Sequence, residues 1–304
     1  MKINIISLGA CTGVDILTTD SKHRDNYTLS NSSIWASSVG RSMVPSGKIA
    51  ERLLSDLGDT SKLSLQARRQ LNAITKFNNP VDILKNAPAN SVIMVDLGYE
   101  ITDYVIQGDE EFDMRPGWFD IKHLFPAWLD EVVSTGLTKF DSNSTWGTMH
   151  NYTERRRRLQ QFFAILNKYK FPVIIIDNAW NPFTYNKEFN SITQTISVFN
   201  SRVPFLISDG SQNNIMLNYN YANKIINSVY ETAKNTYQTV YKDNKHWVWF
   251  DLDRSMLYSD PEHPHGHHPC HLHYTCRKIL NPSLLSLINK LYLTKEENET
   301  NQNF

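Results

Sequence analysis

The sequence predicts an α/β domain built around a doubly wound, mainly parallel sheet. Four short apolar runs end in small or acidic residues and have the composition of strands that are covered on both faces. They span residues 3–8, 91–97, 171–177 and 246–252. Helical stretches alternate with these runs, and parallel strands need such crossover connections. We therefore expect helices above and below a single sheet.

Helices are expected where apolar residues recur at intervals of three and four. These stretches span residues 47–58, 154–170 and 220–242. The segment 107–150 is too long for a simple connection, so we expect it to form a lid or side wall. Residues 1–293 are then a single domain with this long insertion. The charged and amide-rich residues 294–304 are expected to be a disordered tail.

The composition excludes several classes of protein. The chain has 304 residues and 40% hydrophobic content, which is enough to bury a full core. Lys plus Arg and Asp plus Glu number 31 each, so charge gives no reason to expect nucleic acid or anionic lipid as a partner. Three cysteines are too few for a disulfide framework and indicate a reducing, cytoplasmic location. No apolar window is long enough for an integral membrane segment, and no secretory signal is expected.

The first predicted strand runs directly into the turn GACTGVD, which contains Cys11. Ligands of open parallel sheets bind beyond the carboxyl ends of the strands. A thiol at such a turn is held accessible, and a helix N-terminus favours its thiolate, so Cys11 is a candidate nucleophile. Gly9 and Gly13 would leave backbone N–H groups free to face an oxyanion, but their spacing does not match a dinucleotide or Walker loop. A small buried cysteine in a shaped turn is an equally weighted alternative.

Residues 260–274, DPEHPHGHHPCHLHY, contain six histidines. Asp260 and His263 have the spacing D-x-x-H, which lets a carboxylate orient an imidazole whose other nitrogen reaches a nucleophile. Zinc is a rival interpretation, but the loop lacks the H-E-x-x-H or paired C-x-x-C pattern of metal sites, and no metal is expected. A polar loop whose histidines face solvent or backbone carbonyls is the third alternative. The catalytic interpretation is favoured.

Further candidate residues lie elsewhere in the chain, several of them at or after the ends of the other predicted strands. Arg41 could bind an anionic sugar or phosphate, or form a structural ion pair. Asp96 and Glu100 could act as acid and base, or could cap a helix and pair with Arg41. Trp180 and Tyr185 could stack on a sugar ring, or could be local core.

Four blocks of the chain resemble the SGNH/GDSL-type hydrolase superfamily. The similar blocks are SLGACTGVD (7–15), SIWASSVGRSM (33–43), VIMVDLGYE (92–100) and the histidine-rich loop. More specifically, they are similar to an SGNH-like branch encoded among bacterial capsule and surface-polysaccharide genes. The resemblance implies a flavodoxin-like three-layer α/β/α sandwich and the hydrolysis or transfer of an acyl group on a glycan. It implies no required cofactor, with acetyl-CoA as a donor if the reaction is a transfer.

The resemblance also assigns roles to individual residues. Cys11 stands where the family has its serine nucleophile, Asp260 and His263 match the D-x-x-H of the last block, and Gly40 stands where a glycine N–H serves the oxyanion hole. Three features depart from the pattern: the serine is replaced by cysteine, the preceding aspartate by Ala10, and the asparagine donor of the third block is unmatched. A thiol can still attack an ester. Loss of one oxyanion donor lowers the rate by roughly a hundredfold or more.

The resulting hypothesis is a Cys–His–Asp acyl-group hydrolase or O-acyltransferase acting on a surface glycan or its precursor. One alternative is a catalytically inactive glycan-binding or assembly protein, which the missing aspartate and asparagine favour. A second alternative is a metal-dependent phosphoesterase or transferase that uses the histidine-rich loop.

Overall fold

The computed structural model of the chain describes most of the central sheet and the elements around it. The described residues are 2–9, 11–20, 25–35, 55, 58–59, 61, 80–98, 103–107, 110–114, 138–139, 149–176, 180–194, 227–241, 246–263 and 271–301.

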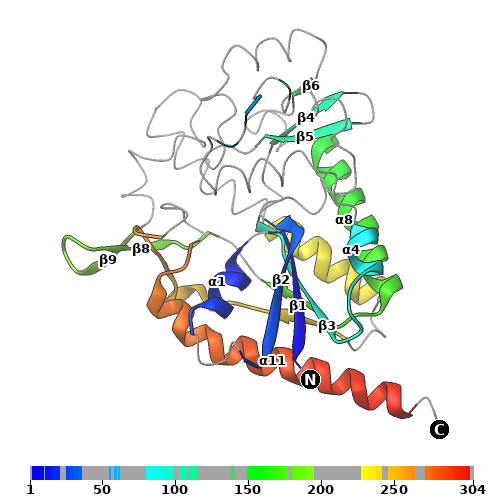
Figure 1. Cartoon of the computed structure of the whole chain (residues 1–304). Helices are drawn as coiled ribbons and strands as arrows, with labels where there is room; N and C mark the ends of the chain where they lie inside the picture. The colour runs from blue at the N-terminus through cyan, green and yellow to red at the C-terminus, as the bar shows by residue number, and fades with distance from the viewer. Residues whose placement is uncertain are drawn as a thin grey trace.

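The centre of the fold is a five-stranded sheet in which every pair of neighbouring strands is parallel (Figure 1). In spatial order its strands are β10 (Trp247–Phe250), β7 (Val173–Ile176), β3 (Ser91–Asp96), β1 (Ile3–Gly9) and β2 (Tyr27–Trp35). Counted along the chain from the β2 edge, this order is 2-1-3-4-5, one of the two common doubly wound arrangements. The predicted α/β class with a mainly parallel sheet is confirmed. Four of the five strands lie where the apolar runs predicted them.

Helices cover both faces of this sheet. One face carries α4 (Pro80–Lys85), α8 (Met149–Tyr169) and the helical residues 227–240, and the other carries α1 (Thr12–Thr18) and α11 (Tyr274–Asn301). Successive side chains of a strand point to opposite faces, so β3 directs Ile93 toward the α8 side and Met94 toward the α1 side. Each face therefore has its own hydrophobic core, as the continuous apolar runs require.

Two smaller sheets flank the central one. In the first, β4 (Asp103–Gln107) pairs antiparallel with β5 (Glu110–Met114) and with β6 (Thr138–Lys139). Most of these residues belong to the predicted insertion. The second contains the hairpin of β8 (Phe183–Asn186) and β9 (Ser191–Gln194), which extends to one side of the central sheet in Figure 1. The short strand β11 (Tyr258–Ser259) pairs parallel with β8.

Some elements differ from the expectation. The strand β2 is not among the predicted strands because its sequence, YTLSNSSIW, is largely polar and forms an edge of the sheet. The predicted tail is corrected: α11 continues to Asn301, because a helix already nucleated by packing extends readily through Lys and Glu residues. Lys295 donates to the carbonyl of Ala89 at 2.6 Å. The predicted helix at residues 47–58 lies almost entirely outside the described residues.

Among the helices that the structure describes, none offers the apolar length that a bilayer crossing requires.

The helix α1 is held at its C-terminal end by side chains from distant parts of the chain. It has seven residues, too few for an isolated helix to be stable. Asn281 of α11 donates its side-chain amide to the carbonyls of Ile16 at 2.9 Å and Leu17 at 3.2 Å. The Tyr27 hydroxyl of β2 donates to the same Leu17 carbonyl at 2.8 Å. Tertiary contacts therefore fix where α1 lies.

Gly9, the last residue of β1, occupies a position that accepts only glycine. Its φ is +92°, in the region that side-chain-bearing residues avoid. Gly9 also pairs in register with Asp96, and a Cβ at Gly9 would overlap the Asp96 carbonyl oxygen. A larger residue would separate β1 from β3 at the end of both strands.

We expect Gly9→Ala to destabilise the protein by about 3 kcal/mol or more, because it combines backbone strain with a backbone clash. Gly58→Ala is the matched control, since Gly58 has a φ of +58° but nothing within 4 Å of the added Cβ. Its loss should be about 1 kcal/mol. The free energy of unfolding in urea measures both variants, and equal losses would contradict the proposed close approach.

Candidate active site

The candidate site lies at the carboxyl ends of β1 and β3. In the observed strand order this is the point where the chain connections diverge, and doubly wound sheets place their ligands there. Gly9 ends β1 and pairs with Asp96, which ends β3. Cys11 follows as the N-cap residue of α1. The turn after the first strand, where the sequence predicts a nucleophile, therefore lies at the switch point of the sheet.

The buried carboxylate of Asp96 holds this turn together. The residue is 1% exposed, its Oδ2 accepts the Thr12 N–H at 3.0 Å, and its Oδ1 accepts the Gly98 N–H at 3.0 Å. The N-cap residue Cys11 makes no side-chain capping hydrogen bond. Asp96 supplies from a neighbouring strand the acceptor that an N-cap side chain normally supplies. Both carboxylate oxygens bind backbone N–H groups, so the geometry favours the capping interpretation of Asp96 over an acid or base role.

We expect Asp96→Asn to lower the free energy of unfolding by roughly 2–4 kcal/mol, because an amide nitrogen would face one of the two buried N–H donors. Asp253→Asn is the matched control. The exposed Asp253 carboxylate accepts the Ser255 N–H at 3.1 Å and the Ser255 hydroxyl at 2.7 Å, at the start of the 3-10 helix η5 (Arg254–Met256). Urea denaturation should show a much smaller loss for the control. Similar losses of unfolding free energy in the two variants would mean that the Asp96 cap stabilises the fold no more than the exposed Asp253 cap does.

Cys11 lies at the rim of the sheet. Among the described residues, the two hydrophobic clusters include Cys276 but not Cys11. Burial raises the pKa of the Cys276 thiol, which keeps it protonated at neutral pH. Cys11 is 1% exposed, so a reagent reaches its sulfur only if neighbouring residues move. Both thiols are buried, and what distinguishes Cys11 is its place at the N-terminus of α1, just after β1.

His263 contacts the first turn of α1. Its Nε2 lies 3.3 Å from Oδ2 of Asp15, and the two side chains are 1% and 13% exposed. The Asp15 N–H donates to the Cys11 carbonyl at 2.8 Å, so Asp15 lies one helical turn after Cys11. The histidine-rich loop comes late in the sequence, and the fold therefore brings it against the helix that Cys11 caps.

Asp260 makes other contacts. Its Oδ2 lies 3.6 Å from Nη2 of Arg277 in α11, and its Oδ1 accepts the Glu262 N–H at 3.0 Å. The second contact is a local turn, in which an Asp side chain bonds to the backbone two residues later. The carboxylate that the structure places against His263 is therefore Asp15, whereas the D-x-x-H spacing indicated Asp260. Sequence spacing fixes how close two residues can lie, but not where their side chains point.

A short antiparallel bridge closes the base of the histidine-rich loop. Ser259 pairs with Leu272, and the Asp260 N–H donates to the His271 carbonyl at 2.8 Å. Side chains alternate across this bridge. His271 is 1% exposed and stacks on His263, with ring centroids 4.1 Å apart. Backbone pairing thereby places His271 against His263. Residues 264–270, with the other three histidines, lie outside the described residues.

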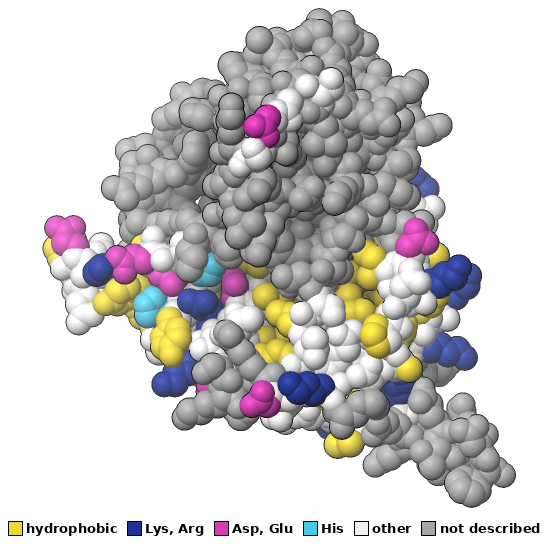
Figure 2. Space-filling view, viewed as in Figure 1, with side chains coloured by type: hydrophobic (Ala, Val, Ile, Leu, Met, Phe, Trp, Pro, Cys, Tyr) yellow, Lys and Arg dark blue, Asp and Glu magenta, His cyan; other side chains and the backbone are white. Residues whose placement is uncertain are grey.

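The next histidine, His273, lies away from His263. Its ring stacks on Tyr258 with centroids 5.0 Å apart and lies 4.9 Å from the ring of Tyr185. Lys187 and Glu262 form an exposed ion pair of 2.7 Å nearby. Figure 2 shows charged, histidine and apolar side chains together on this part of the surface, beside the β8–β9 hairpin.

The remaining predicted site residues divide into two groups. Trp180 is 2% exposed and packs in the core on the α8 side, so its ring is not a surface for a sugar. Gly40, Arg41 and Glu100 lie outside the described residues. Sequence reasoning missed Asp15 and His271. The signal for Asp15 was its place one helical turn after Cys11, and the signal for His271 was the alternation of side chains along a strand.

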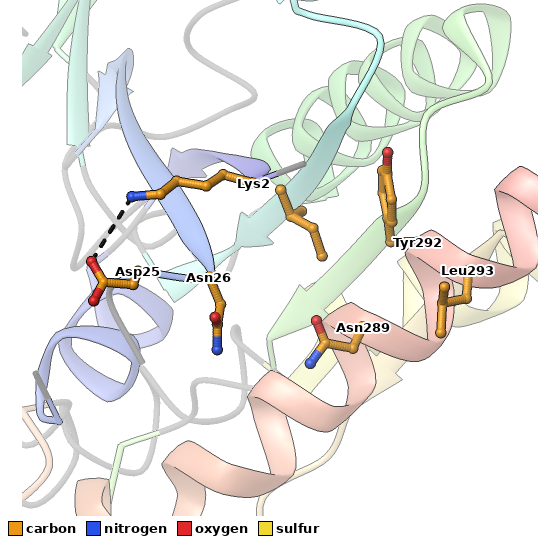
Figure 3. Close-up of a pocket in the computed structure, with 7 residues that line it drawn as sticks. Lys2, Asp25, Asn26, Asn289, Tyr292 and Leu293 are labelled. Carbon is orange, nitrogen blue, oxygen red and sulfur yellow. Dashed lines mark ion pairs between the residues drawn. The ribbon is translucent and has the colours of Figure 1, made fainter. Parts of the chain in front are cut away.

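Two other features of the described residues bear on where a ligand could bind. Among the described residues, no group of three or more His, Cys, Asp or Glu residues could hold a metal ion. A cavity of about 800 Å³ lies between the start of β1 and α11, lined by Lys2, Ile3, Asp25, Asn26, Asn289, Tyr292 and Leu293 (Figure 3). It is at the amino ends of the strands, away from Cys11 and His263. Sheets of this class place their ligands at the opposite ends.

Comparisons with known proteins give no match: no family model, curated protein or solved structure is similar to this chain. The geometry around Cys11, Asp15 and His263 therefore carries the functional interpretation.

Proposed function

We propose that this protein is an acyl-group hydrolase or O-acyltransferase that acts on a surface glycan or its precursor. The observation that carries the proposal is the position of His263, whose imidazole lies against the first turn of the helix that Cys11 caps, 3.3 Å from Asp15. Nucleophilic acyl transfer needs a thiol and an imidazole that can share a proton, and here both belong to the region around the N-terminus of α1.

The reaction proceeds in two steps. His263 takes the proton of the Cys11 thiol as Sγ attacks the acyl carbon, and the resulting tetrahedral intermediate expels the donor's alcohol or thiol, which receives that proton. The product of this step is a thioester on Cys11. In the second step a water molecule or a glycan hydroxyl attacks the thioester carbon and loses its proton to His263. The sulfur leaves as a thiolate and takes the proton back.

The architecture supports this proposal. The strand order 2-1-3-4-5 is that of flavodoxin-like sheets, which the resemblance to SGNH/GDSL-type hydrolases implies. In the same pattern, the nucleophile directly follows the first strand and the D-x-x-H block comes late in the chain. Cys11 and His263 occupy these places along the chain.

The Thr12 hydroxyl is the described side chain best suited to replace the missing asparagine donor. Its Oγ1 is buried and has no hydrogen-bond partner among the described residues. Thr12 is the first residue of α1 and directly follows Cys11. Its backbone N–H is engaged by Asp96, so the hydroxyl and not the amide is the group that remains to face an oxyanion.

A non-catalytic glycan-binding role is the alternative that a specific observation favours, namely the 1% exposure of Cys11. In that case the thiol is a buried structural residue and the His263 contact only fastens the loop. The assays below separate the two functions.

We expect the purified protein to hydrolyse p-nitrophenyl acetate or deacetylate an acetylated oligosaccharide, and Cys11→Ala or His263→Gln to lose roughly a thousandfold or more in kcat. Mass spectrometry should find the acyl group on the Cys11 peptide. Cys276→Ala is the matched control and should retain activity, because that thiol belongs to the core. Unchanged turnover in Cys11→Ala would remove the mechanism, and loss of turnover with a chelator would favour the metal-dependent alternative.

We expect Thr12→Val to lower kcat by about tenfold to a thousandfold, because it removes one donor to the oxyanion. The same change should leave the free energy of unfolding equal or higher, since it replaces an unsatisfied buried hydroxyl with a methyl group of similar size. Turnover and urea denaturation of the same preparation measure the two effects. If Thr12→Val lowers the free energy of unfolding but not kcat, the Thr12 hydroxyl has a structural role and is not an oxyanion donor.

A further inference from the structure

We infer that Asp15 is the positioning residue for His263, and that Asp260 instead fastens the histidine-rich loop to α11. The inference rests on the proposed function, because it assigns the carboxylate that prepares His263 for proton transfer from Cys11.

The contact between Asp15 and His263 has the features of an orienting pair. Its atoms are 3.3 Å apart, and the two side chains are 1% and 13% exposed, so water screens the interaction weakly. Asp15 is also rigidly placed, because the helix that carries it is bound at one end by Asp96 and at the other by Asn281. A carboxylate on a fixed helix can hold an imidazole in one orientation.

Asp260 is occupied elsewhere. One carboxylate oxygen faces Arg277 of α11 and the other accepts the Glu262 N–H. These contacts join the beginning of the loop to the helix that follows it. Asp260 therefore acts on His263 only through the loop backbone.

The ring of His263 is constrained from a second side. His271 stacks on it with centroids 4.1 Å apart, and the bridge at Ser259 and Leu272 fixes the backbone from which His271 projects. Among the described residues, Asp15 lies at Nε2 of this ring and His271 stacks on its face. Together they restrict rotation of the imidazole about its χ angles.

This arrangement selects the nitrogen that acts as base. With the Nε2–H of His263 donating a hydrogen bond to the Asp15 carboxylate, Nδ1 carries the lone pair that can accept a proton. In the first step the Cys11 proton passes to Nδ1, and the Asp15 carboxylate stabilises the resulting imidazolium. The proton returns from Nδ1 to the leaving group, so Nε2 never exchanges its proton during turnover.

The kinetic test compares three aspartates. Asp15→Asn should lower kcat by roughly a hundredfold to ten-thousandfold with little change in KM, because an amide no longer fixes the tautomer or stabilises the imidazolium. Asp15→Glu should recover part of the loss. Asp260→Asn should lower kcat by less than about tenfold, since its effect passes through the loop. Asp82→Asn removes an exposed carboxylate from the first turn of α4 and should match the wild type.

A spectroscopic test needs no activity. In protein labelled with ¹⁵N only at histidine, the ring signals of His263, identified by their loss in His263→Gln, should show the proton on Nε2 at neutral pH. Asp15→Asn should shift them toward a mixture of tautomers, and Asp260→Asn should leave them in place. Thermal melting establishes that each variant is folded, and Asp15→Ala, which also removes the carboxylate, replaces Asp15→Asn if the latter is not.

The outcomes separate this inference from the proposed function. Suppose that turnover depends on Cys11 and His263, that Asp260→Asn loses both kcat and the Nε2 tautomer, and that Asp15→Asn loses neither. This result would overturn the role of Asp15 and leave the proposed acyl transfer in place. An inactive protein whose His263 tautomer still depends on Asp15 would keep the pairing and overturn the proposed reaction.

Discussion

The buried carboxylate of Asp96 is the constraint on which the candidate site depends. It ends β3, lies beside the last residue of β1, and binds the first backbone N–H of α1. A carboxylate with so little water around it must be satisfied by hydrogen bonds, and here backbone N–H groups provide them. One side chain therefore ties the end of β3 to the start of the helix that follows β1. Cys11 and Asp15 take their positions from that helix.

The opposite end of α1 is bound by the last helix of the chain. Asn281 reaches the terminal carbonyls of α1, and the loop that contains His263 lies just before the same helix, α11. The position of α11 therefore determines both where α1 ends and where the histidine-rich loop begins. A helix as short as α1 has little stability of its own, so its place depends on these contacts at both ends. The site is consequently a property of the packed α1–α11 pair.

The histidine-rich loop shows how backbone pairing sorts similar side chains. Six histidines lie close together in the sequence, and composition treats them alike. Next to the bridge between Ser259 and Leu272, two of them have different environments, because His271 stacks on His263 and His273 lies against two tyrosines. The two carboxylates also have different partners, since Asp260 contacts Arg277 whereas Asp15 contacts His263. Residues of the same type that lie near one another therefore take separate roles because their side chains point in different directions.

The sequence by itself determined the fold class, four of the central strands, the helix α8 and the turn that holds Cys11, because apolar periodicity records burial on each face of a strand or helix. Tertiary structure alone decided the polar edge strand β2, where Asn4 joins Ser30 and Ser91 across neighbouring strands by side-chain hydrogen bonds. It also decided the course of α11, which contains Pro282, and the partner of His263. The physical reason is that periodicity is local, whereas the direction of a polar side chain is fixed by groups that lie far away in the chain and come together only in the packed fold.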